Sequence, residues 1–200
     1  MRQIIVTGFE PYGQYKENPT RDLVKSLDGK KVGDFRVNGL VLPAMYYEAA
    51  NKLLDSFDNP PYAIISTGLS SKILVPRLET TTRNEMFSKY KDARGRNPEK
   101  EPIIKGGPES YRTNIDSIDL ANKLEAQGLK VEVSADANTF ICNSLMYLTI
   151  RDIENRKLRT KFLFMHTPWT ERYKQDIEKD KPTIPEEELE KIVRTLIKIV

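Results

Sequence analysis

The run Tyr62-Ala63-Ile64-Ile65-Ser66-Thr67-Gly68 is the stretch of sequence that decides the fold class. Its residues are apolar or small, and they lack the alternation of polar and apolar side chains that marks a strand with one face in water. A strand of this kind is buried on both faces, and Gly68 marks its end. The run therefore predicts a central strand of a parallel sheet that is covered by helices on both sides.

Strand and helix patterns alternate on both sides of this run. Short β-rich runs predict strands, and apolar residues at helical spacing, bounded by Pro or Gly, predict helices. The predicted strands are residues 4–6, 35–42, 62–67, 129–134 and 161–166, and the predicted helices are residues 19–27, 45–57, 117–127, 142–153 and 185–200. This order predicts an α/β fold of three layers, in which a central, mostly parallel and twisted sheet is flanked by helices. The pattern does not predict the strand order.

The length of 200 residues fits a single domain over residues 1–200. Within it, residues 83–108 are rich in charge, glycine and proline. A segment of that length without a strand or helix pattern is functional or mobile in most compact domains. We therefore expect a long polar loop inside the domain and no linker.

The composition excludes several classes of protein. Thirty-two basic and 29 acidic residues give a net charge of +3 with both signs mixed along the chain, so nucleic acid is not the expected partner. No apolar run reaches the roughly 20 residues that span a bilayer, and no signal peptide precedes the first strand. One cysteine allows no internal disulfide, so we expect a protein of the reducing cytoplasm.

Cys142 and His166 are the only cysteine and the only histidine. A lone cysteine is either a small buried apolar residue or a nucleophile, and Cys142 falls where a loop after a predicted strand enters a predicted helix. A lone histidine beside an apolar strand is often structural, but it is also the side chain best suited to proton transfer near neutrality. One cysteine and one histidine without close carboxylates do not make a zinc site, so we expect no metal and no cofactor.

A third group would be needed to hold the imidazole in one tautomer. Any of the 29 carboxylates could do so as far as composition shows. Glu79 is a candidate because it lies shortly after the predicted strand that ends at Gly68, although a single glutamate is most often a solvated surface charge. The residues alone leave this choice open.

Four segments taken together resemble the pyroglutamyl peptidase I family, also called pyrrolidone carboxyl peptidases, and they occur in the family's order over nearly the whole chain. The first segment, residues 7–13 with Asn18-Pro19-Thr20, is similar to the family's TGFEPFG and NPS/T signature. The others are Gly68-Leu69 with Glu79 and Asn84, the GGPESY stretch at 106–111, and the pair formed by Thr139-Phe140-Ile141-Cys142-Asn143 and Phe164-Met165-His166-Thr167-Pro168.

The resemblance implies a cysteine peptidase that removes an N-terminal pyroglutamyl residue from peptides through a thioester. It makes Cys142 the nucleophile, His166 the general base and then acid, and Glu79 the group that orients His166. It further implies that Phe9, Tyr12, Phe140 and Ile141 form the pocket for the lactam ring. Asn18 is expected to fix the first loop in place.

The sequence departs from the family's pattern at several positions. Lys89 stands where the family has the arginine assigned to oxyanion support, and lysine keeps the charge but loses the planar fork. Asn138 stands where glycine often precedes the nucleophile segment, and asparagine tolerates positive φ better than most residues. Ser71-Lys72 replace a Gly-Arg pair, and Thr80 replaces a basic residue.

Two other functions stay open at this point. A phosphorylase could use a similar α/β scaffold, although no Gly-rich phosphate loop with lysine is present. A non-catalytic relative could bind acylated N-termini. The resemblance also implies a homo-oligomer, typically a tetramer, for which the apolar face of the helix predicted at 185–200 would be either an interface or a face packed on the sheet.

Overall fold

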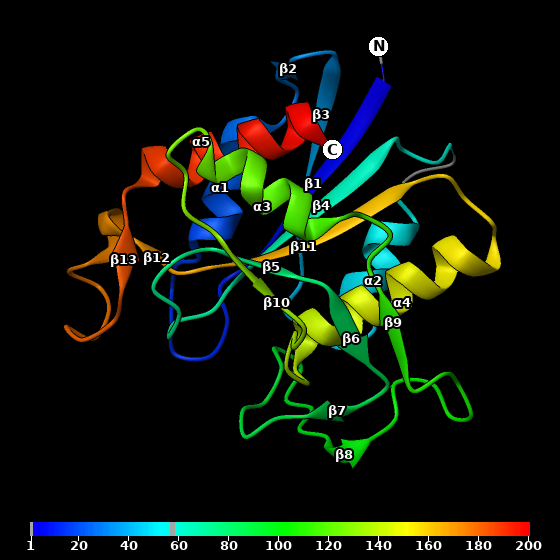
Figure 1. The fold of residues 1–200 in the computed structure, drawn as a ribbon. Helices are drawn as coiled ribbons and strands as arrows, with labels where there is room; N and C mark the ends of the chain where they lie inside the picture. The colour runs from blue at the N-terminus through cyan, green and yellow to red at the C-terminus, as the bar shows by residue number, and fades with distance from the viewer. Residues whose placement is uncertain (1, 57–58) are drawn as a thin grey trace.

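A seven-stranded sheet forms the centre of the computed structural model, which describes residues 2–56 and 59–200 (Figure 1). Its strands follow the order β10-β5-β11-β4-β1-β3-β2. In chain order they are β1 (Arg2–Phe9), β2 (Lys31–Val32), β3 (Phe35–Leu42), β4 (Ala63–Leu69), β5 (Arg77–Glu79), β10 (Glu132–Ser134) and β11 (Lys161–Thr167).

The sheet is mostly parallel, as predicted. Strands β11, β4, β1 and β3 run in one direction, whereas β5 is antiparallel to β11 and β2 is antiparallel to β3. Strand β4, which contains most of the run at 62–67, is buried at every residue from Ala63 to Leu69. Its position between β11 and β1 confirms that the run is a central strand covered on both faces.

Five α-helices in the described part of the chain flank the sheet. They are α1 (Pro19–Leu27), α2 (Glu48–Leu54), α3 (Ser117–Glu125), α4 (Ile141–Asn155) and α5 (Glu186–Ile199). Figure 1 shows α1, α3 and α5 on one side of the sheet and α2 and α4 on the other. The three-layer prediction is therefore confirmed.

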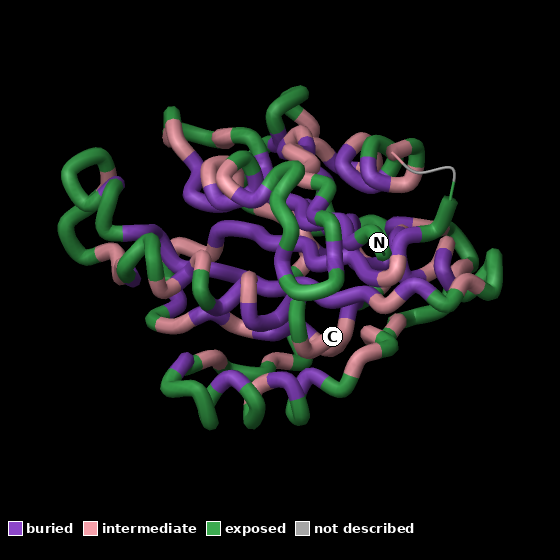
Figure 2. Tube along the Cα trace, turned by 90° about the horizontal axis from the view of Figure 1, so that it is seen from above, coloured by how far each residue is buried: buried purple, intermediate pink, exposed green. Residues whose placement is uncertain are grey.

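Two apolar cores lie on the two faces of the sheet, because successive strand residues point to opposite faces. Ile65 and Leu163 belong to the core under α1, α3 and α5, while Ile64 and Phe162 belong to the core under α2 and α4. Figure 2 shows that buried segments run through the middle of the molecule. The apolar face of α5 is part of the first core, so it packs on the sheet and is not exposed for an interface.

Several predicted elements have different bounds in the structure. The helix predicted at 45–57 is limited to α2, because Tyr47 before it adopts φ 63°, outside the helical range; Phe57 lies outside the described residues. The strand predicted at 129–134 begins only at Glu132. No strand was predicted at β5, which is three residues long.

The predicted loop at 83–108 contains short strands. Strands β7 (Met86–Phe87) and β8 (Glu99–Glu101) pair with each other, and β6 (Thr81–Arg83) pairs with β9 (Ser110–Arg112). After β11, strand β12 (Trp169–Thr170) leads into a 3₁₀ turn at Glu171–Tyr173 and pairs with β13 (Thr183–Ile184). None of the described helices is both long and apolar enough to cross a membrane.

Candidate active site

Cys142 is the second residue of α4, at the carboxyl edge of the sheet. The residue before the helix, Phe140, provides no side-chain cap, and no acidic residue lies in the first turn. The first N–H groups of the helix are therefore free to face an anion, and the helix dipole adds positive potential there. The half-buried sulfur thus lies where a negative charge on it is stabilised.

His166 and Glu79 form a buried pair. Nδ1 of His166 lies 2.8 Å from Oε1 of Glu79, and the two residues are only 4% and 1% exposed. His166 is near the end of β11, and Glu79 ends the neighbouring antiparallel strand β5. An Nδ1–H that donates to the carboxylate leaves Nε2 to exchange a proton with a neighbouring group.

The sulfur of Cys142 lies beside this pair. Gly68 of β4 is opposite His166 of β11 in the sheet register, and a Cβ placed on Gly68 would be 3.0 Å from Sγ of Cys142. Glycine is therefore needed here for space, because any side chain would push against the sulfur. Thiol, imidazole and carboxylate thus come together from α4, β11 and β5.

The pKa of His166 reflects both neighbours. Burial lowers this pKa, but the negative charge of Cys142, side-chain hydrogen bonding to Cys142 and Glu79, and the charge of Glu79 outweigh it and raise the pKa to about 9. Each of these groups favours the protonated imidazolium. The arrangement therefore favours the protonated form of His166.

Aromatic rings line the space next to the sulfur. The rings of Tyr12 and Phe140 lie 6.0 Å apart at 51°, and Phe9 is buried in the same core as Phe140 and Ile141. Burial raises the pKa of Tyr12, and the negative charge of Cys142 raises it further. The structure therefore places Tyr12 beside Phe140, and it places Phe9 and Ile141 in the core against which both rings pack.

Tyr46 is an aromatic residue of this region that the sequence analysis missed. Its ring lies 5.6 Å from that of Phe140 in an edge-on arrangement, and it is fully buried. Burial raises the pKa of Tyr46, and charges on Asp92 and Cys142 add to this. Tyr46 lies in the segment 45–57, which was predicted as a helix, and nothing in that helical pattern indicates that its side chain faces Phe140.

Asn18 fixes the loop that carries Tyr12. Its Oδ1 accepts a hydrogen bond from the N–H of Thr20 at the start of α1, and its Nδ2 donates to the carbonyl of Glu10. The Thr20 hydroxyl in turn accepts from the N–H of Phe9. The loop is thereby tied to α1.

Asn143, the residue after the nucleophile, was quoted in the sequence motif without a role. Its Nδ2 donates to the carbonyls of Arg83 and Glu85, and its Oδ1 accepts from the N–H of Arg83 and the hydroxyl of Thr82. This fully buried amide ties the first turn of α4 to β6 and the residues after it. It therefore fixes where the helix presents Cys142.

Two of the departures can be located in the structure. Asn138 adopts φ 63°, a conformation that asparagine tolerates, so the loop before the nucleophile keeps the geometry expected of glycine. Lys89 is exposed, and within residues 2–56 and 59–200 it makes no hydrogen bond or ion pair with Cys142, His166 or Glu79. Its role at the oxyanion stays a prediction.

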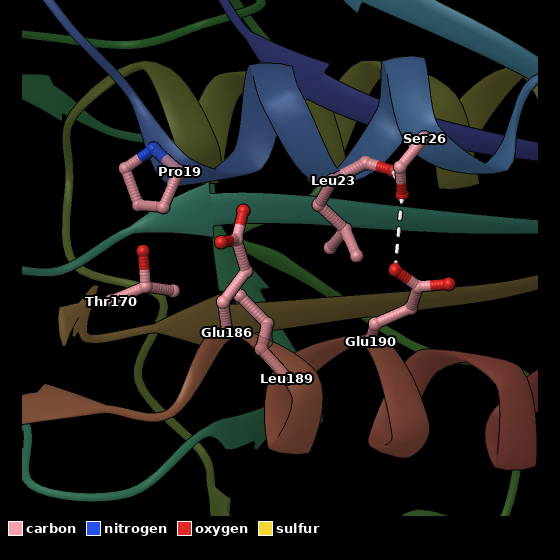
Figure 3. A pocket seen from close by; sticks show the side chains of 7 residues that line it. All are labelled: Pro19, Leu23, Ser26, Thr170, Glu186, Leu189 and Glu190. Carbon is pink, nitrogen blue, oxygen red and sulfur yellow. Dashed lines mark hydrogen bonds between the residues drawn. The ribbon is translucent and has the colours of Figure 1, made fainter. Parts of the chain in front are cut away.

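Two cavities are found elsewhere in the described structure, and Cys142 lines neither. A small one of about 30 Å³ lies between α1 and α5, where Ser26 Oγ donates to Glu190 at 3.4 Å (Figure 3). It is on the face of the sheet opposite α4 and has room for little more than water. A larger one of about 360 Å³ lies beside Tyr15 and Trp169.

In the described part of the chain, no group of three or more metal-binding side chains occurs.

A thiol at a helix start, an imidazole and a buried carboxylate on neighbouring elements are the arrangement of a cysteine hydrolase. Comparison with protein families matches residues 2–200 to the family described as pyroglutamyl peptidase. The chain belongs to this family of cysteine peptidases.

Individual relatives agree with this assignment. The chain is 32% identical over 168 residues to a pyrrolidone-carboxylate peptidase of Pyrococcus furiosus, which covers 84% of this chain and 81% of the relative. It is 35% identical over 148 residues to that of Halalkalibacterium halodurans, covering 72% of each. Among solved structures, the pyrrolidone carboxyl peptidase of P. furiosus superposes with a TM-score of 0.92 at 30% identity, covering 98% of this chain and 97% of the other.

Proposed function

We propose that this chain hydrolyses the amide bond after an N-terminal pyroglutamyl residue, with Cys142 as nucleophile, His166 as general base and acid, and Glu79 as the residue that positions the imidazole. The observation that carries this assignment is the contact of 2.8 Å between His166 and Glu79 beside the sulfur that lies over Gly68. Membership of the pyroglutamyl peptidase family supports the reaction.

The reaction divides into two steps. Transfer of the Cys142 proton to His166 gives a thiolate, which attacks the pyroglutamyl carbonyl and forms a tetrahedral oxyanion. When the carbon–nitrogen bond breaks, the imidazolium gives its proton to the departing amine, and a thioester remains on Cys142. Water then loses a proton to His166, attacks the thioester and releases pyroglutamate together with the restored thiol.

The free N–H groups at the start of α4 support the oxyanion. The helix begins at Ile141, so the N–H groups of Cys142 and its neighbours point out of the first turn without a capping side chain. Donors held in place where charge develops stabilise the transition state more than the substrate. Lys89 would add a positive charge to this support.

The pocket suits a flat and neutral ring. Phe9, Tyr12 and Phe140 supply aromatic walls, and the main chain at Ile141 would pair with the lactam N–H and C=O. A prolyl N-terminus has the same ring size but carries a positive amine. The imidazolium and the positive end of α4 would both repel that charge.

One assay tests this function against the alternatives. The protein is incubated with a pyroglutamyl chromogenic amide and with the matching prolyl amide, each with and without iodoacetamide. We expect release from the pyroglutamyl amide alone and its loss after alkylation of Cys142. If the chromophore is released from neither amide, the proposed function is wrong. The protein would then be a non-catalytic relative that binds acylated N-termini, or a phosphorylase-like enzyme.

The location and assembly of the protein belong to the same proposal. We expect action in the cytoplasm on small peptides, and a homo-oligomer, typically a tetramer, as the family resemblance implies. Leu74, Ile118 and Val133 are large apolar side chains that are at least 39% exposed in the single chain and that a second copy could cover. Light scattering of the purified protein tests the assembly, and a monomer at all concentrations would contradict it.

A further inference from the structure

The cavity of about 360 Å³ lies at the carboxyl edge of the sheet. One wall comes from the loop after β1, including Gln14 and Tyr15, and the other comes from the segment after β11, including Trp169, Tyr173 and Ile177. The volume is in the range of sites that hold small ligands. It is large enough for an apolar amino-acid side chain.

Both walls lead directly into the catalytic site. On one side, the N–H of Tyr15 donates to the carbonyl of Tyr12, whose ring lines the lactam pocket. On the other side, Trp169 follows His166 by three residues, so their Cα atoms are at most about 10 Å apart. An extended peptide covers about 3.3 Å per residue. A side chain two or three residues beyond the scissile bond is therefore within reach of this cavity.

The lining combines aromatic and apolar side chains with the charged residues Lys16, Glu17 and Asp176. The ring of Trp169 lies 4.9 Å from that of Tyr15 and 5.8 Å from that of Tyr173, both in edge-on arrangements. Trp169 is only 1% exposed, and its Nε1 has no hydrogen-bond acceptor among the described residues. That nitrogen is sealed from solvent, so Trp169 contributes its ring to the wall of the cavity and not a donor to a ligand.

Hydrogen bonds hold the two walls together. Nε2 of Gln14 donates to Glu178 at 2.9 Å, and the hydroxyl of Tyr15 donates to the same carboxylate at 3.1 Å. The cavity is thus bounded on both sides before a ligand arrives. A preformed site of this kind binds without the entropic cost of ordering its walls.

We propose that this cavity is a subsite for the departing part of the peptide. It takes an apolar side chain two or three residues after the pyroglutamyl group, which would lie against Tyr15, Trp169 and Ile177. The inference rests on the function proposed above, because the peptide must first place its pyroglutamyl ring between Tyr12 and Phe140. The subsite makes the enzyme distinguish peptides by the residues that follow the bond it cuts.

The test compares two peptides that differ only at those positions. One is pyroglutamyl-alanyl-leucyl-leucyl-glycine, and the other has glycine in place of both leucines. We expect kcat/KM of the unmodified enzyme to be about tenfold higher for the leucyl peptide, and Ile177→Ala to remove most of this ratio. Ile199→Ala is the matched control, because Ile199 is half-buried like Ile177, lies at the end of α5 and does not line the cavity. The ratio should not change in that variant.

Trp169→Phe provides the second variant, since it keeps an aromatic ring but makes that wall of the cavity smaller. A wall of the subsite at Trp169 predicts that this variant also lowers the ratio of the two kcat/KM values, whereas a purely structural role would lower both values equally and leave the ratio unchanged. Equal ratios in the unmodified enzyme and in both variants, with both peptides cleaved, would overturn the subsite. Failure to cleave either peptide would instead overturn the proposed function.

Discussion

Nδ1 of His166 lies 2.8 Å from Oε1 of Glu79, and this contact is sealed from solvent because the two residues are 4% and 1% exposed. Oε2 of the same carboxylate has no hydrogen-bond partner in the described part of the chain. Among the described residues, the imidazole is thus the one hydrogen-bond partner of the Glu79 side chain. The charge of Glu79 therefore acts mainly on His166.

Replacement of Glu79 by glutamine tests that relationship. Glu79→Gln keeps the size of the side chain and removes the charge that favours the imidazolium. The pKa of His166, raised to about 9 in the native protein, should fall. We expect kcat to drop by about two to four orders of magnitude, and the alkaline limb of the kcat/KM profile to move to lower pH. An unchanged alkaline limb would show that the carboxylate does not act on the imidazole.

The stability of the fold should depend on pH through the same histidine. The pKa of His166 is about 9 in the folded protein, against about 6.5 for an unfolded chain, so the folded state binds its proton more tightly. This stabilisation is fully present below about pH 6.5 and is lost as the pH rises through about 9. Denaturation by urea at a series of pH values should show the loss in the native protein. His166→Asn, which has no histidine left, should show a flatter dependence over that window.

Gly68 should be required for the position of the sulfur. In Gly68→Ala the new Cβ would lie 3.0 Å from Sγ of Cys142 and 2.9 Å from Cζ of Phe164, so both must move. We expect a loss of about 100-fold in kcat/KM, because small displacements of reacting groups are costly. The rate of alkylation by iodoacetamide reports on the sulfur directly and should change in the same variant.

Gly39→Ala is the matched control for this substitution. Its Cβ would approach Cβ of Asp28 and the carbonyl of Val24 to 2.8 Å, in β3 and away from Cys142. Both variants should unfold at a lower denaturant concentration than the native protein. Only Gly68→Ala should lose activity beyond what its folded fraction explains, and equal losses in the two would contradict a specific role for Gly68.

Asn143→Ala should loosen the start of α4. The substitution removes hydrogen bonds to Thr82, Arg83 and Glu85 and leaves buried backbone groups without partners, at a cost of about 1–3 kcal/mol. Unfolding in urea measures this cost. Asn155→Ala at the exposed end of the same helix should have little effect, and a similar change in both would show that the buried amide adds nothing.

The sequence alone predicted the layers of the fold well because strands such as β4 and helices such as α5 have strong apolar patterns. It did not predict β5, which is only three residues long and antiparallel to β11. That strand places Glu79 against His166 across 87 positions of the chain. Without it, no local pattern could select one carboxylate out of 29, and only the family resemblance did so.

The remaining gaps have the same cause. The contacts of Asn143 with β6 and of Tyr46 with Phe140 join segments that are far apart in the chain. A single sequence carries no periodic signal for such contacts. The cavity beside Trp169 likewise exists only because β1 and β11 end at the same edge of the sheet.

The most direct test of the account compares Cys142→Ser with the native protein in the hydrolysis of a pyroglutamyl chromogenic amide. The substitution exchanges sulfur for oxygen at one atom, and circular dichroism with urea unfolding checks that the fold is kept. Transfer of the acyl group to Cys142 predicts rapid hydrolysis by the native protein and none detectable by the folded variant. Hydrolysis by Cys142→Ser at a rate close to that of the native protein would contradict it.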